Sequence, residues 1–338
     1  MSASKSASVA VVVLNYNGLD DTLKCLASLR AVQYPLLSVH LVDNGSAVDP
    51  TAAALSAYPG LRVLKTGTNL GYAGGNNRGI EAVLGTATDY VLVLNNDTVV
   101  DPSIIEALVQ AFATDSRLGI VGPTINFMDE PHAVMTDGVQ FNPGLGVDFF
   151  HRIEVPLNQP EAPLVDVDIV NGCCMMIRAD VLRAVGGLDE SMFIVHEESD
   201  LCLRAKLKGF RCAVLGRTLV WHKGSSSFER SGRQLQRYFD TRNLFYLLKR
   251  YSGRVPGSRS VRNSLWYYFR YVSYRYEHER EAKKDAAALA VVDGLRDALA
   301  GVTGPYTFRQ RRGATTLRMI LSTLQQISRV KARLFSRR

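Results

Sequence analysis

The chain has 338 residues, of which 46% are apolar and 21% are charged, and its formal net charge is +8. This length and apolar content allow a full core and suggest about two domains. No run approaches the roughly 18 apolar residues that a membrane-spanning helix needs, and the first residues lack the hydrophobic core of a signal peptide. We therefore expect a globular protein that stays in the cytoplasm.

The charge is unevenly distributed along the chain. Residues 1–230 hold 17 Lys and Arg against 25 Asp and Glu, a net −8, whereas residues 231–338 hold 23 against 7, a net +16. A basic tail is attracted to an anionic membrane surface or to nucleic acid, or it is simply a solvated helical surface. The five cysteines form no CxxC pair and no even set, which fits a reducing compartment and predicts small core residues.

The first 122 residues alternate between two kinds of segment. Runs of apolar, often β-branched residues predict strands at 8–14, 37–42, 61–65, 90–94 and 118–122. Apolar residues at helical spacing predict helices at 19–29, 50–58 and 102–113, and the glycine-rich stretch 69–79 opens another towards Val83. This alternation predicts an α/β fold with a mainly parallel sheet.

The second half of the chain is less regular. Residues 123–168 contain several Pro and Gly and predict short strands or a hairpin, and a loop region of this length is often functional. Further strands are expected at 171–178, 211–215 and 218–221, with helices at 179–185 and from Asp200, a typical N-cap residue, through Lys208. We expect one domain over residues 1–230 and a basic helical region over 231–338. In that region Trp266-Tyr267-Tyr268-Phe269 either rests on a bilayer or packs on the α/β domain.

Polar residues follow several of the predicted strands. Asp43, Asp97, the acids at 197, 198 and 200, and His222 all fall at strand ends, where ligands bind in open α/β sheets. Asn95-Asn96-Asp97 is equally well suited to a turn. The segment 69–79 suits phosphate binding or tight helix–sheet packing, but it does not match the dinucleotide pattern. Together these clusters predict a site for a charged ligand and a metal.

Eight segments carry a resemblance to a known family. They span residues 11–18, 42–46, 69–77, 94–98, 186–190, 197–204, 222–226 and 238–243, in the family's order. Over residues 8–250 the chain resembles the inverting glycosyltransferases of family 2. It is especially similar to the bacterial enzymes that add rhamnose or related sugars to surface polysaccharides such as O-antigen. The resemblance implies a GT-A fold, which is Rossmann-like with a mixed sheet between helices, here with a helical C-terminal extension.

The resemblance also implies a donor site. Tyr16 and Asp43 match positions that hold the nucleotide base. Gly75, Asn76 and Asn77 match the turn beneath the nucleotide, and Asn96 lies in the donor-binding segment. The favoured donor is dTDP-rhamnose, with UDP-hexoses next. The acceptor is a glycan or a lipid-linked glycan, which would place the protein at the inner face of the cell membrane and leaves no role for nucleic acid.

The catalytic residues are implied in the same way. Asp97 matches the last acid of the metal motif and His222 a histidine that completes the metal site, with Mg²⁺ or Mn²⁺ as the ion. Lys223 and the serines after it could meet the leaving diphosphate. Glu198 matches the base that deprotonates the acceptor, although relatives have Asp there, so Glu197 remains a rival and Asp200 a supporting residue.

Asp189 and Glu190 match a loop that borders the acceptor pocket, but a turn role suits them equally.

Two alternative functions from other classes of protein remain. A nucleotidyltransferase would also pair an α/β sheet with a metal-bound nucleotide, but Asn15-Tyr-Asn-Gly-Leu-Asp-Asp21 is acidic where such an enzyme has a basic glycine-rich loop. A non-enzymatic protein that binds membrane or nucleic acid does not explain the acids at the sheet edge.

Overall fold

The structure is a computed structural model that describes residues 6–142, 150–159, 161–224, 233–256, 258, 260–307 and 316–323. The chain divides into two compact units. Unit one comprises Met1–Gln140, Arg152–Phe193 and Glu197–Gly224, and unit two comprises Phe141–His151, Ile194–His196 and Ser225–Arg338. The predicted division of the chain at residue 230 stays a prediction. No helix in the described ranges is long and apolar enough to cross a bilayer.

Unit one alternates strands and helices from its first residues, as the sequence predicts. Its elements up to the middle of the chain are β1 (Val9–Asn15), α1 (Leu19–Arg30), β2 (Leu37–Asp43), α2 (Thr51–Ala57), β3 (Arg62–Lys65), α3 (Gly71–Leu84), β4 (Tyr90–Asn95), β5 (Thr98–Val100), α4 (Ile104–Phe112) and β6 (Leu118–Phe127). The elements that follow along the chain are β7 (Val134–Thr136), β8 (Val139–Phe141), β9 (Phe150–Arg152), β10 (Leu164–Val167), β11 (Cys174–Arg178), α5 (Ala179–Val185), the 3₁₀ turn η1 (Glu190–Met192), α6 (Glu197–Leu207) and β12 (Arg211–His222), of which β9 belongs mostly to unit two.

Among the described residues, ten strands form one mixed sheet. The main order is β10-β12-β6-β11-β4-β1-β2-β3, with β5 paired to β12 and β7 to β6. β1, β2, β3 and β4 are parallel, whereas β11 lies antiparallel between β4 and β6. The expected α/β fold with a mainly parallel, mixed sheet is confirmed.

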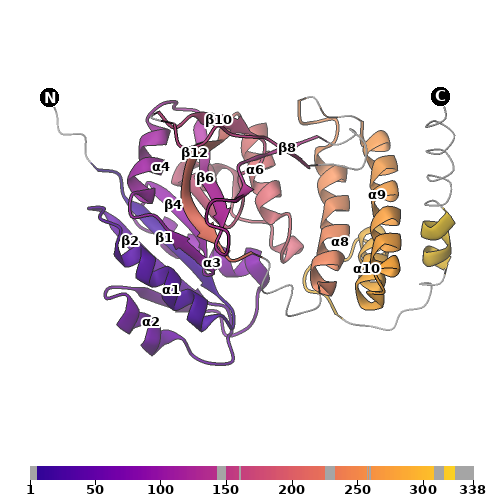
Figure 1. Ribbon diagram of the computed structural model, residues 1–338, viewed down its shortest axis with the longest axis horizontal. Coiled ribbons are helices and arrows are strands. Elements are labelled where there is room, and N and C mark those ends of the chain that lie inside the picture. The colour runs from indigo at the N-terminus through magenta and orange to yellow at the C-terminus, as the bar shows by residue number, and fades with distance from the viewer. Residues whose placement is uncertain are drawn as a thin grey trace. The chain divides into compact units, whose positions relative to one another are not determined.

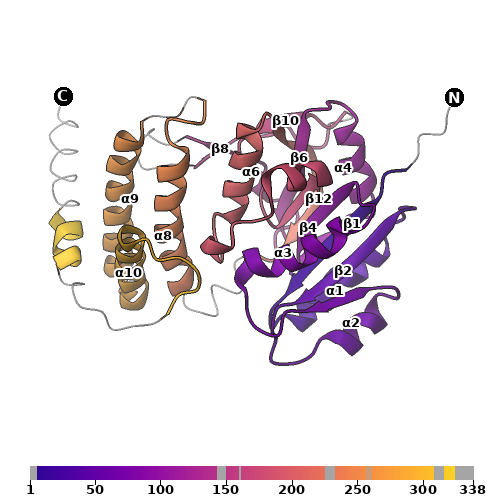
Figure 2. The ribbon, with the colours of Figure 1, turned by 180° about the vertical axis from the view of Figure 1, so that it is seen from behind.

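Helices cover both faces of this sheet. One face packs a buried cluster that includes Val9, Val11 and Val13 of β1 against α1, α2 and α4 (Figure 1). The opposite face is covered by α3 and α6, seen from behind in Figure 2. The Cα atom of Gly79 lies so close to that face that an added Cβ would be 2.3 Å from Val12 Cγ1. All five cysteines are free and buried, as their expected role as small core residues requires.

The structure differs from the predicted elements at several points. β5 was not predicted, and the helix expected from Pro102 begins at Ile104. The strands expected at 211–215 and 218–221 are one strand, β12, with a register irregularity between Leu215 and Thr218. The N-cap prediction for Asp200 is wrong, because α6 begins at Glu197 and Asp200 lies within its first turn.

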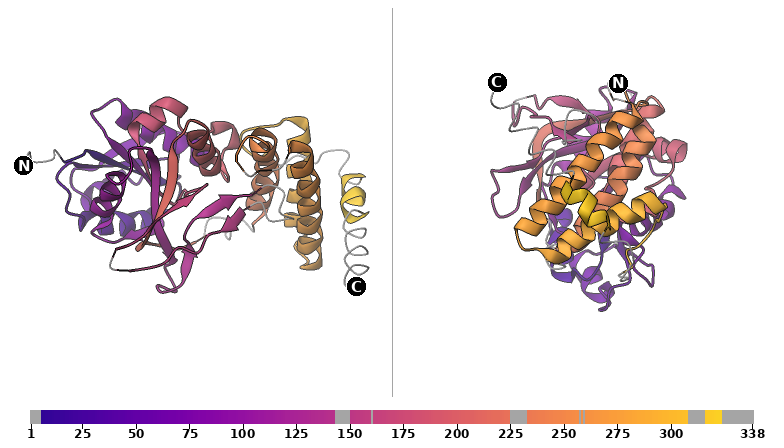
Figure 3. Two further views of the ribbon diagram at one scale, coloured as in Figure 1. Left: turned by 90° about the horizontal axis from the view of Figure 1, so that it is seen from above. Right: turned by 90° about the vertical axis from the view of Figure 1, so that its right-hand side faces the viewer.

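Unit two contains three long helices, α8 (Gln234–Tyr251), α9 (Val261–Glu281) and α10 (Asp285–Ala300), which pack against one another. They are the orange helices in Figure 3. Tyr268 of α9 is buried and donates a 2.7 Å hydrogen bond to Thr241 O of α8. The helical character predicted for the C-terminal region is confirmed, although most of the segment 307–338 lies outside the described residues.

The middle of α8 also holds a short segment of unit two. Asn243 Nδ2 donates to Ile194 O at 2.9 Å and to Val195 O at 2.7 Å. His196 Nε2 lies 3.1 Å from Asp240 Oδ1. Val195 and His196 both have positive φ, which is costly for residues with a Cβ. These contacts from α8 stabilise that backbone conformation.

Candidate functional site

The candidate site lies at the carboxyl ends of β1, β2 and β4. The register pairs Asn15 with Asp43 and Leu14 with Asn95, so three parallel strands end along one edge. The strand order reverses at β1, which lies between β2 and β4. Chains leave such a switch point in different directions and open a crevice for a ligand. Asp43 and the segment ending at Asp97 therefore come to the same edge, as expected.

Asp43 and Tyr16 lie at the β1 and β2 end of this crevice. Asp43 is 5% exposed, and its Oδ1 accepts hydrogen bonds from Asn15 Nδ2 at 3.4 Å and from the backbone N–H of Ser46 at 3.3 Å. Tyr16 follows Asn15 directly and is 47% exposed. A fixed carboxylate and an exposed ring are able to hydrogen-bond and stack on a heterocyclic base.

The glycine-rich segment forms the first turns of α3. A Cβ at Gly75 would lie 2.5 Å from Leu14 Cδ1, so the helix lies directly on β1. Asn76 is fully buried and its Nδ2 donates to Tyr72 O at 3.0 Å. Tight helix–sheet packing therefore accounts for these residues in the structure. Contact of Gly75, Asn76 and Asn77 with a nucleotide stays a prediction.

Asn77 connects α3 to the loop that follows α5. Its Nδ2 donates to Leu188 O at 2.9 Å and to Glu190 Oε1 at 3.0 Å, and its Oδ1 accepts from Leu188 N at 2.9 Å. In the same loop, Asp189 accepts a 3.0 Å hydrogen bond from Ser191 N, which is the turn role suited to its residue type. The amide of Asn77 thus sets the position of the 188–190 loop.

Asp97 and His222 meet at the other end of the crevice, where β5 pairs with β12. The register places Thr98 opposite His222. His222 Nε2 lies 3.0 Å from Asp97 Oδ1, and each side chain is 14% exposed. Asn95 Nδ2 lies 3.5 Å from the same ring nitrogen. We call Asn95, Asp97 and His222 the cation centre.

The donor set of the cation centre fits a divalent ion held mainly by substrate. Asn95 Oδ1 is buried and accepts no hydrogen bond from any described residue, and such an acceptor is costly unless it binds a ligand. The described residues contain no group of three or more His, Cys, Asp or Glu that could hold an ion alone. Mg²⁺ commonly uses one or two carboxylates with substrate phosphates and water, whereas an imidazole ligand favours Mn²⁺.

Asn96 and Lys223 tie the start of α1 to this centre. Asn96 Nδ2 donates to Thr22 Oγ1 at 2.9 Å, so its amide is engaged within the fold. Lys223 Nζ lies 3.0 Å from Asp21 Oδ1. The serines Ser225–Ser227, which were expected to act with Lys223 on a diphosphate, lie outside the described residues.

Glu197 and Glu198 begin α6 in different surroundings. Glu197 is 4% exposed, and its Oε2 has no hydrogen-bond partner among the described residues. Burial first, and the negative charge of Glu198 second, hold the pKa of Glu197 well above its usual range. Glu198 is half-buried and its Oε1 accepts a 3.3 Å hydrogen bond from Ser199 Oγ. Glu197 therefore holds its proton more tightly than an ordinary glutamate does.

Asp200 supports the fold around these acids. It is fully buried, and its Oδ2 accepts a 2.7 Å hydrogen bond from Arg204 Nε. Arg204 Nη2 in turn donates to Gly187 O at 2.6 Å. This ion pair links α6 to the loop after α5, and the supporting role of Asp200 in catalysis stays a prediction.

Tyr72 was missed by the sequence analysis, although it lies inside the segment 69–77. Its hydroxyl donates a 2.6 Å hydrogen bond to Gly172 O. Burial raises the pKa of the Tyr72 phenol, and the charges of Glu197, Glu198 and Asp97 raise it further. The turn Gly172-Cys173 contacts both groups: Asn95 N donates to Cys173 O at 2.8 Å, and a Cβ added at Gly172 would lie 3.1 Å from Glu198 Cβ. The acid pair and the cation centre therefore lie next to one turn, and a lone phenol among Gly and Asn was the available signal.

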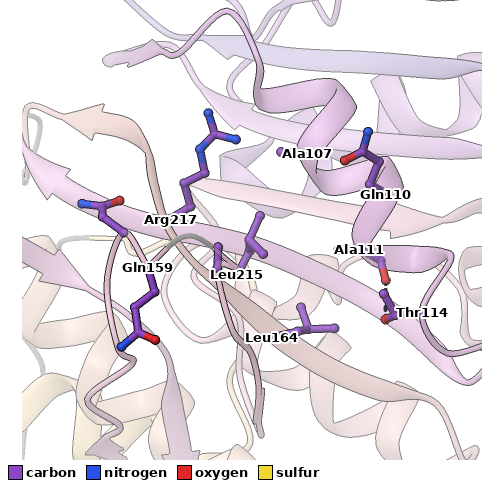
Figure 4. A pocket seen from close by; sticks show the side chains of 10 residues that line it. Ala107, Gln110, Ala111, Thr114, Gln159, Leu164, Leu215 and Arg217 are labelled. Atoms are coloured by element: carbon purple, nitrogen blue, oxygen red, sulfur yellow. Dashed lines mark hydrogen bonds between the residues drawn. The ribbon is translucent and has the colours of Figure 1, made fainter.

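Two cavities are lined by residues other than those of the candidate site. One, of about 510 Å³, is lined by α4, β10 and β12, with Gln110, Gln159 and Arg217 among its side chains (Figure 4). The other, of about 540 Å³, is lined by residues that include Asp89, Arg178 and Asp180. Neither lining includes a residue that the sequence predicts for the site.

Comparisons with known proteins agree with this geometry. A family model described as glycosyltransferase like family 2 matches residues 6–241. The N-acetylglucosaminyl-diphospho-decaprenol L-rhamnosyltransferase of Mycobacterium tuberculosis is 31% identical, over 75% of this chain and 89% of its own length. The low-salt glycan biosynthesis hexosyltransferase Agl10 of Haloferax volcanii is 27% identical, over 70% of this chain and 74% of its own.

Solved structures share the fold. The mannosyltransferase PcManGT from Pyrobaculum calidifontis, in complex with GDP-Man and Mn²⁺, has a TM-score of 0.53 at 14% identity and covers 88% of each chain. Staphylococcus aureus TarS has a TM-score of 0.55 at 14% identity, over 94% of this chain and 53% of its own. These likenesses confirm the expected GT-A fold. Because the family model spans more than half of the chain, the protein belongs to glycosyltransferase family 2.

Proposed function

We propose that this glycosyltransferase moves a sugar from a nucleoside diphosphate donor to an acceptor hydroxyl in a single displacement that inverts the anomeric centre. The observation that carries the proposal is the turn Gly172-Cys173, which contacts both parts of the site: Asn95 N donates to Cys173 O at 2.8 Å, and a Cβ added at Gly172 would lie 3.1 Å from Glu198 Cβ. A base for the acceptor and a centre for the donor diphosphate thus share one crevice. Such a pairing of general base and charge stabilisation is what displacement at an acetal carbon requires.

The donor lies along the strand ends. Tyr16 and Asp43 hold the base of the nucleotide, and Gly75, Asn76 and Asn77 shape the turn beneath it through their packing on β1 and the 188–190 loop. Asn96 keeps the start of α1 in place beside the donor. A divalent cation, Mg²⁺ or Mn²⁺, supplies positive charge to the leaving diphosphate when it is bound. Asp97 and His222 hold it, with Asn95 Oδ1 as a further oxygen.

Glu198 acts as the base. As the acceptor oxygen forms its bond to the anomeric carbon and the bond to the diphosphate breaks, the hydroxyl proton passes to the Glu198 carboxylate. The half-buried Glu198 suits this role better than Glu197, because burial disfavours the charged form of the Glu197 carboxyl, which is the form that accepts a proton. Asp200 supports the acids through Arg204.

Isosteric substitutions separate the two glutamates. Glu198→Gln should lower kcat about 10²- to 10⁴-fold, the usual contribution of a general base. Glu197→Gln should cost far less, because a neutral amide resembles the protonated carboxyl in size and charge. Both variants should bind nucleoside diphosphate as the wild type does. Near-wild-type turnover by Glu198→Gln would refute the base assignment.

We propose dTDP-rhamnose as the favoured donor, with UDP-hexoses next, and a lipid-linked glycan as the acceptor. Support comes from the Mycobacterium tuberculosis relative, whose name specifies rhamnosyl transfer to a diphospho-decaprenol glycan. A panel of nucleotide sugars, scored by thermal shift with and without Mn²⁺, tests the donor. A larger shift with dTDP-rhamnose than with UDP-hexoses is expected, and a larger one with another sugar would replace this assignment.

We further propose that α9 binds an anionic membrane surface from the inner side of the cell. Arg262, Trp266, Arg270, Tyr274 and His278 recur every four residues, and we call them the α9 stripe. Trp266 is 55% exposed and Tyr274 46% exposed, whereas Tyr268, on the opposite face of the helix, is buried. Aromatic rings favour the membrane interface, and each basic residue near an anionic surface adds about 1 kcal/mol.

A further inference from the structure

The first turn of α3 and the turn before β11 meet beside the acid pair. Tyr72 OH donates to Gly172 O at 2.6 Å. The turn that contains Gly172 is fixed from both sides. Cys173 N donates to Asn171 Oδ1 at 2.9 Å, and Asn95 N donates to Cys173 O at 2.8 Å. The Gly172 peptide therefore has a defined place between α3 and the end of β4.

Glu198 packs against the Gly172 peptide. A Cβ added at Gly172 would lie 3.1 Å from Glu198 Cβ, 3.4 Å from Glu198 Cγ and 3.7 Å from Tyr72 OH. The aliphatic part of Glu198 thus lies beside the backbone that Tyr72 holds by its hydrogen bond. A Cβ at position 172 would require the Glu198 side chain to shift by a few tenths of an ångström.

The same turn of α3 supports the segment that precedes the acids. Gly71 has φ +75°, and an added Cβ would lie 2.4 Å from Phe193 O. Ala73 N donates to Phe193 O at 3.1 Å. In this way α3 contacts residues before the acid pair, at Phe193, and beside it, at Gly172.

We propose that Tyr72 is a positioning residue for Glu198: its hydroxyl fixes the Gly172 carbonyl, and the Gly172 peptide orients the Glu198 side chain towards the acceptor. The inference rests on the proposed role of Glu198 as the base. Burial and the nearby carboxylates raise the pKa of the Tyr72 phenol, so the hydroxyl keeps its proton and remains a donor. A base must lie within hydrogen-bond reach of its proton, so a small displacement lowers kcat while donor binding is unchanged.

Tyr72→Phe is the direct test, with Tyr34→Phe as its matched control. The hydroxyl of Tyr34 also donates to a backbone carbonyl, Ala7 O at 2.8 Å, and Tyr34 contacts none of the three acids in the structure. We expect Tyr72→Phe to lower kcat about 5- to 50-fold with the donor KM and nucleoside diphosphate binding unchanged. Tyr34→Phe should leave kcat as in the wild type. Gly172→Ala should lower kcat in the same way, because its Cβ displaces Glu198.

A double-mutant cycle identifies the residue through which Tyr72 acts. In a Glu198→Asp background the carboxylate is already withdrawn by one methylene, so adding Tyr72→Phe should cost much less than it costs the wild type. If the two substitutions lower kcat independently, so that their fold losses multiply in the double variant, the inference is wrong. It is also wrong if Tyr72→Phe alone leaves kcat unchanged. If Tyr72→Phe does not fold, Gly172→Ala in the two backgrounds gives the same test. An active Glu198→Gln enzyme would instead refute the base assignment, whatever Tyr72 does.

Discussion

At the scale of single residues, the adjacent acids Glu197 and Glu198 differ because Glu197 is buried and its Oε2 has no hydrogen-bond partner among the described residues. The pKa of Glu197 is raised from its ordinary value of 4.5, by burial first and by Glu198 second. Above that ordinary value the unfolded chain releases a proton that the folded protein keeps. The stability that the neutral Glu197 carboxyl contributes is therefore fully present at low pH. It is lost as the pH rises through the raised pKa, by up to about 1.4 kcal/mol per pH unit.

Glu197→Gln should abolish this pH dependence. Between about pH 5 and pH 8, the free energy of unfolding of the wild type should fall relative to that of the variant. Urea denaturation at several pH values measures the difference. The exposed Glu106→Gln variant should follow the wild-type curve. Parallel curves for wild type and Glu197→Gln would mean that Glu197 is ionised in the folded protein.

The cation centre should bind its ion weakly until a diphosphate is present. Asp97 is its single carboxylate, and His222 and Asn95 add neutral ligands. Mn²⁺ alone should therefore raise the melting temperature by about 1 °C or less, and Mn²⁺ with UDP or dTDP by several degrees. His222→Ala should reduce the combined shift, whereas the exposed His132→Ala should not. An equal shift with Mn²⁺ alone would point to a complete protein site.

Much of the site could be anticipated at this scale, because strand ends of a parallel sheet meet by geometry. For Asp43 and Asp97, their positions after predicted strands were enough to predict that they lie at the same edge of the sheet. The sequence could not show that Asn76 and Glu197 are buried, because burial depends on residues distant in the chain. Tyr72 was missed for the same reason: its partner Gly172 is 100 positions away.

At the scale of elements, the Asp200–Arg204 pair couples α6 to the loop after α5. Arg204→Met should lower the free energy of unfolding by about 3–5 kcal/mol, because it leaves the buried Asp200 carboxylate without this cation and the Gly187 carbonyl without this donor. Thermal or urea melts measure the loss. The exposed Arg183→Met should stay within about 0.5 kcal/mol of the wild type. A similar small change for Arg204→Met would contradict the coupling.

The same scale shows why some elements were predictable and others were not. β1, β2 and β4 are apolar runs buried on both faces, and α5 (Ala179–Val185) has the predicted bounds because Gly186 ends it. β5 has three residues, too few for a periodic pattern, and exists because β12 pairs with it. β12 was predicted as two strands, whereas the structure has one strand with a register irregularity between Leu215 and Thr218.

At the scale of the whole molecule, the basic residues concentrate in the C-terminal third, which has a net charge of +16. Neither interpretation of its aromatic run, contact with a bilayer or packing on the α/β domain, is tested by the contacts within unit two. Tyr268 packs inside unit two, and Trp266 is exposed on the α9 stripe. A solvated helical surface would not require exposed Trp and Tyr in register with Arg.

Vesicle binding tests this surface with the full chain. The protein should bind vesicles that contain anionic lipid, bind neutral ones weakly, and lose affinity as salt rises, because exposed charges are screened over about 10 Å at 0.1 M salt. Trp266→Ala and Arg262→Ala should each weaken binding measured by sedimentation. Leu299→Ala, on exposed α10 surface, serves as the control. Equal binding to neutral vesicles, or preference for nucleic acid, would refute the membrane proposal.

His222 is the last residue of β12 and lies within a hydrogen-bonded strand rather than in a loop. The irregularity between Leu215 and Thr218 is able to absorb an inserted residue as a wider bulge. The same insertion between Val220 and His222 would turn the imidazole to the opposite face, because side chains alternate along a strand. An inserted residue is therefore tolerated before Val220, at the irregularity, but not between Val220 and His222. The pairing of β12 with β5 therefore fixes the distance between Asp97 and His222, even where the sequence around β12 changes.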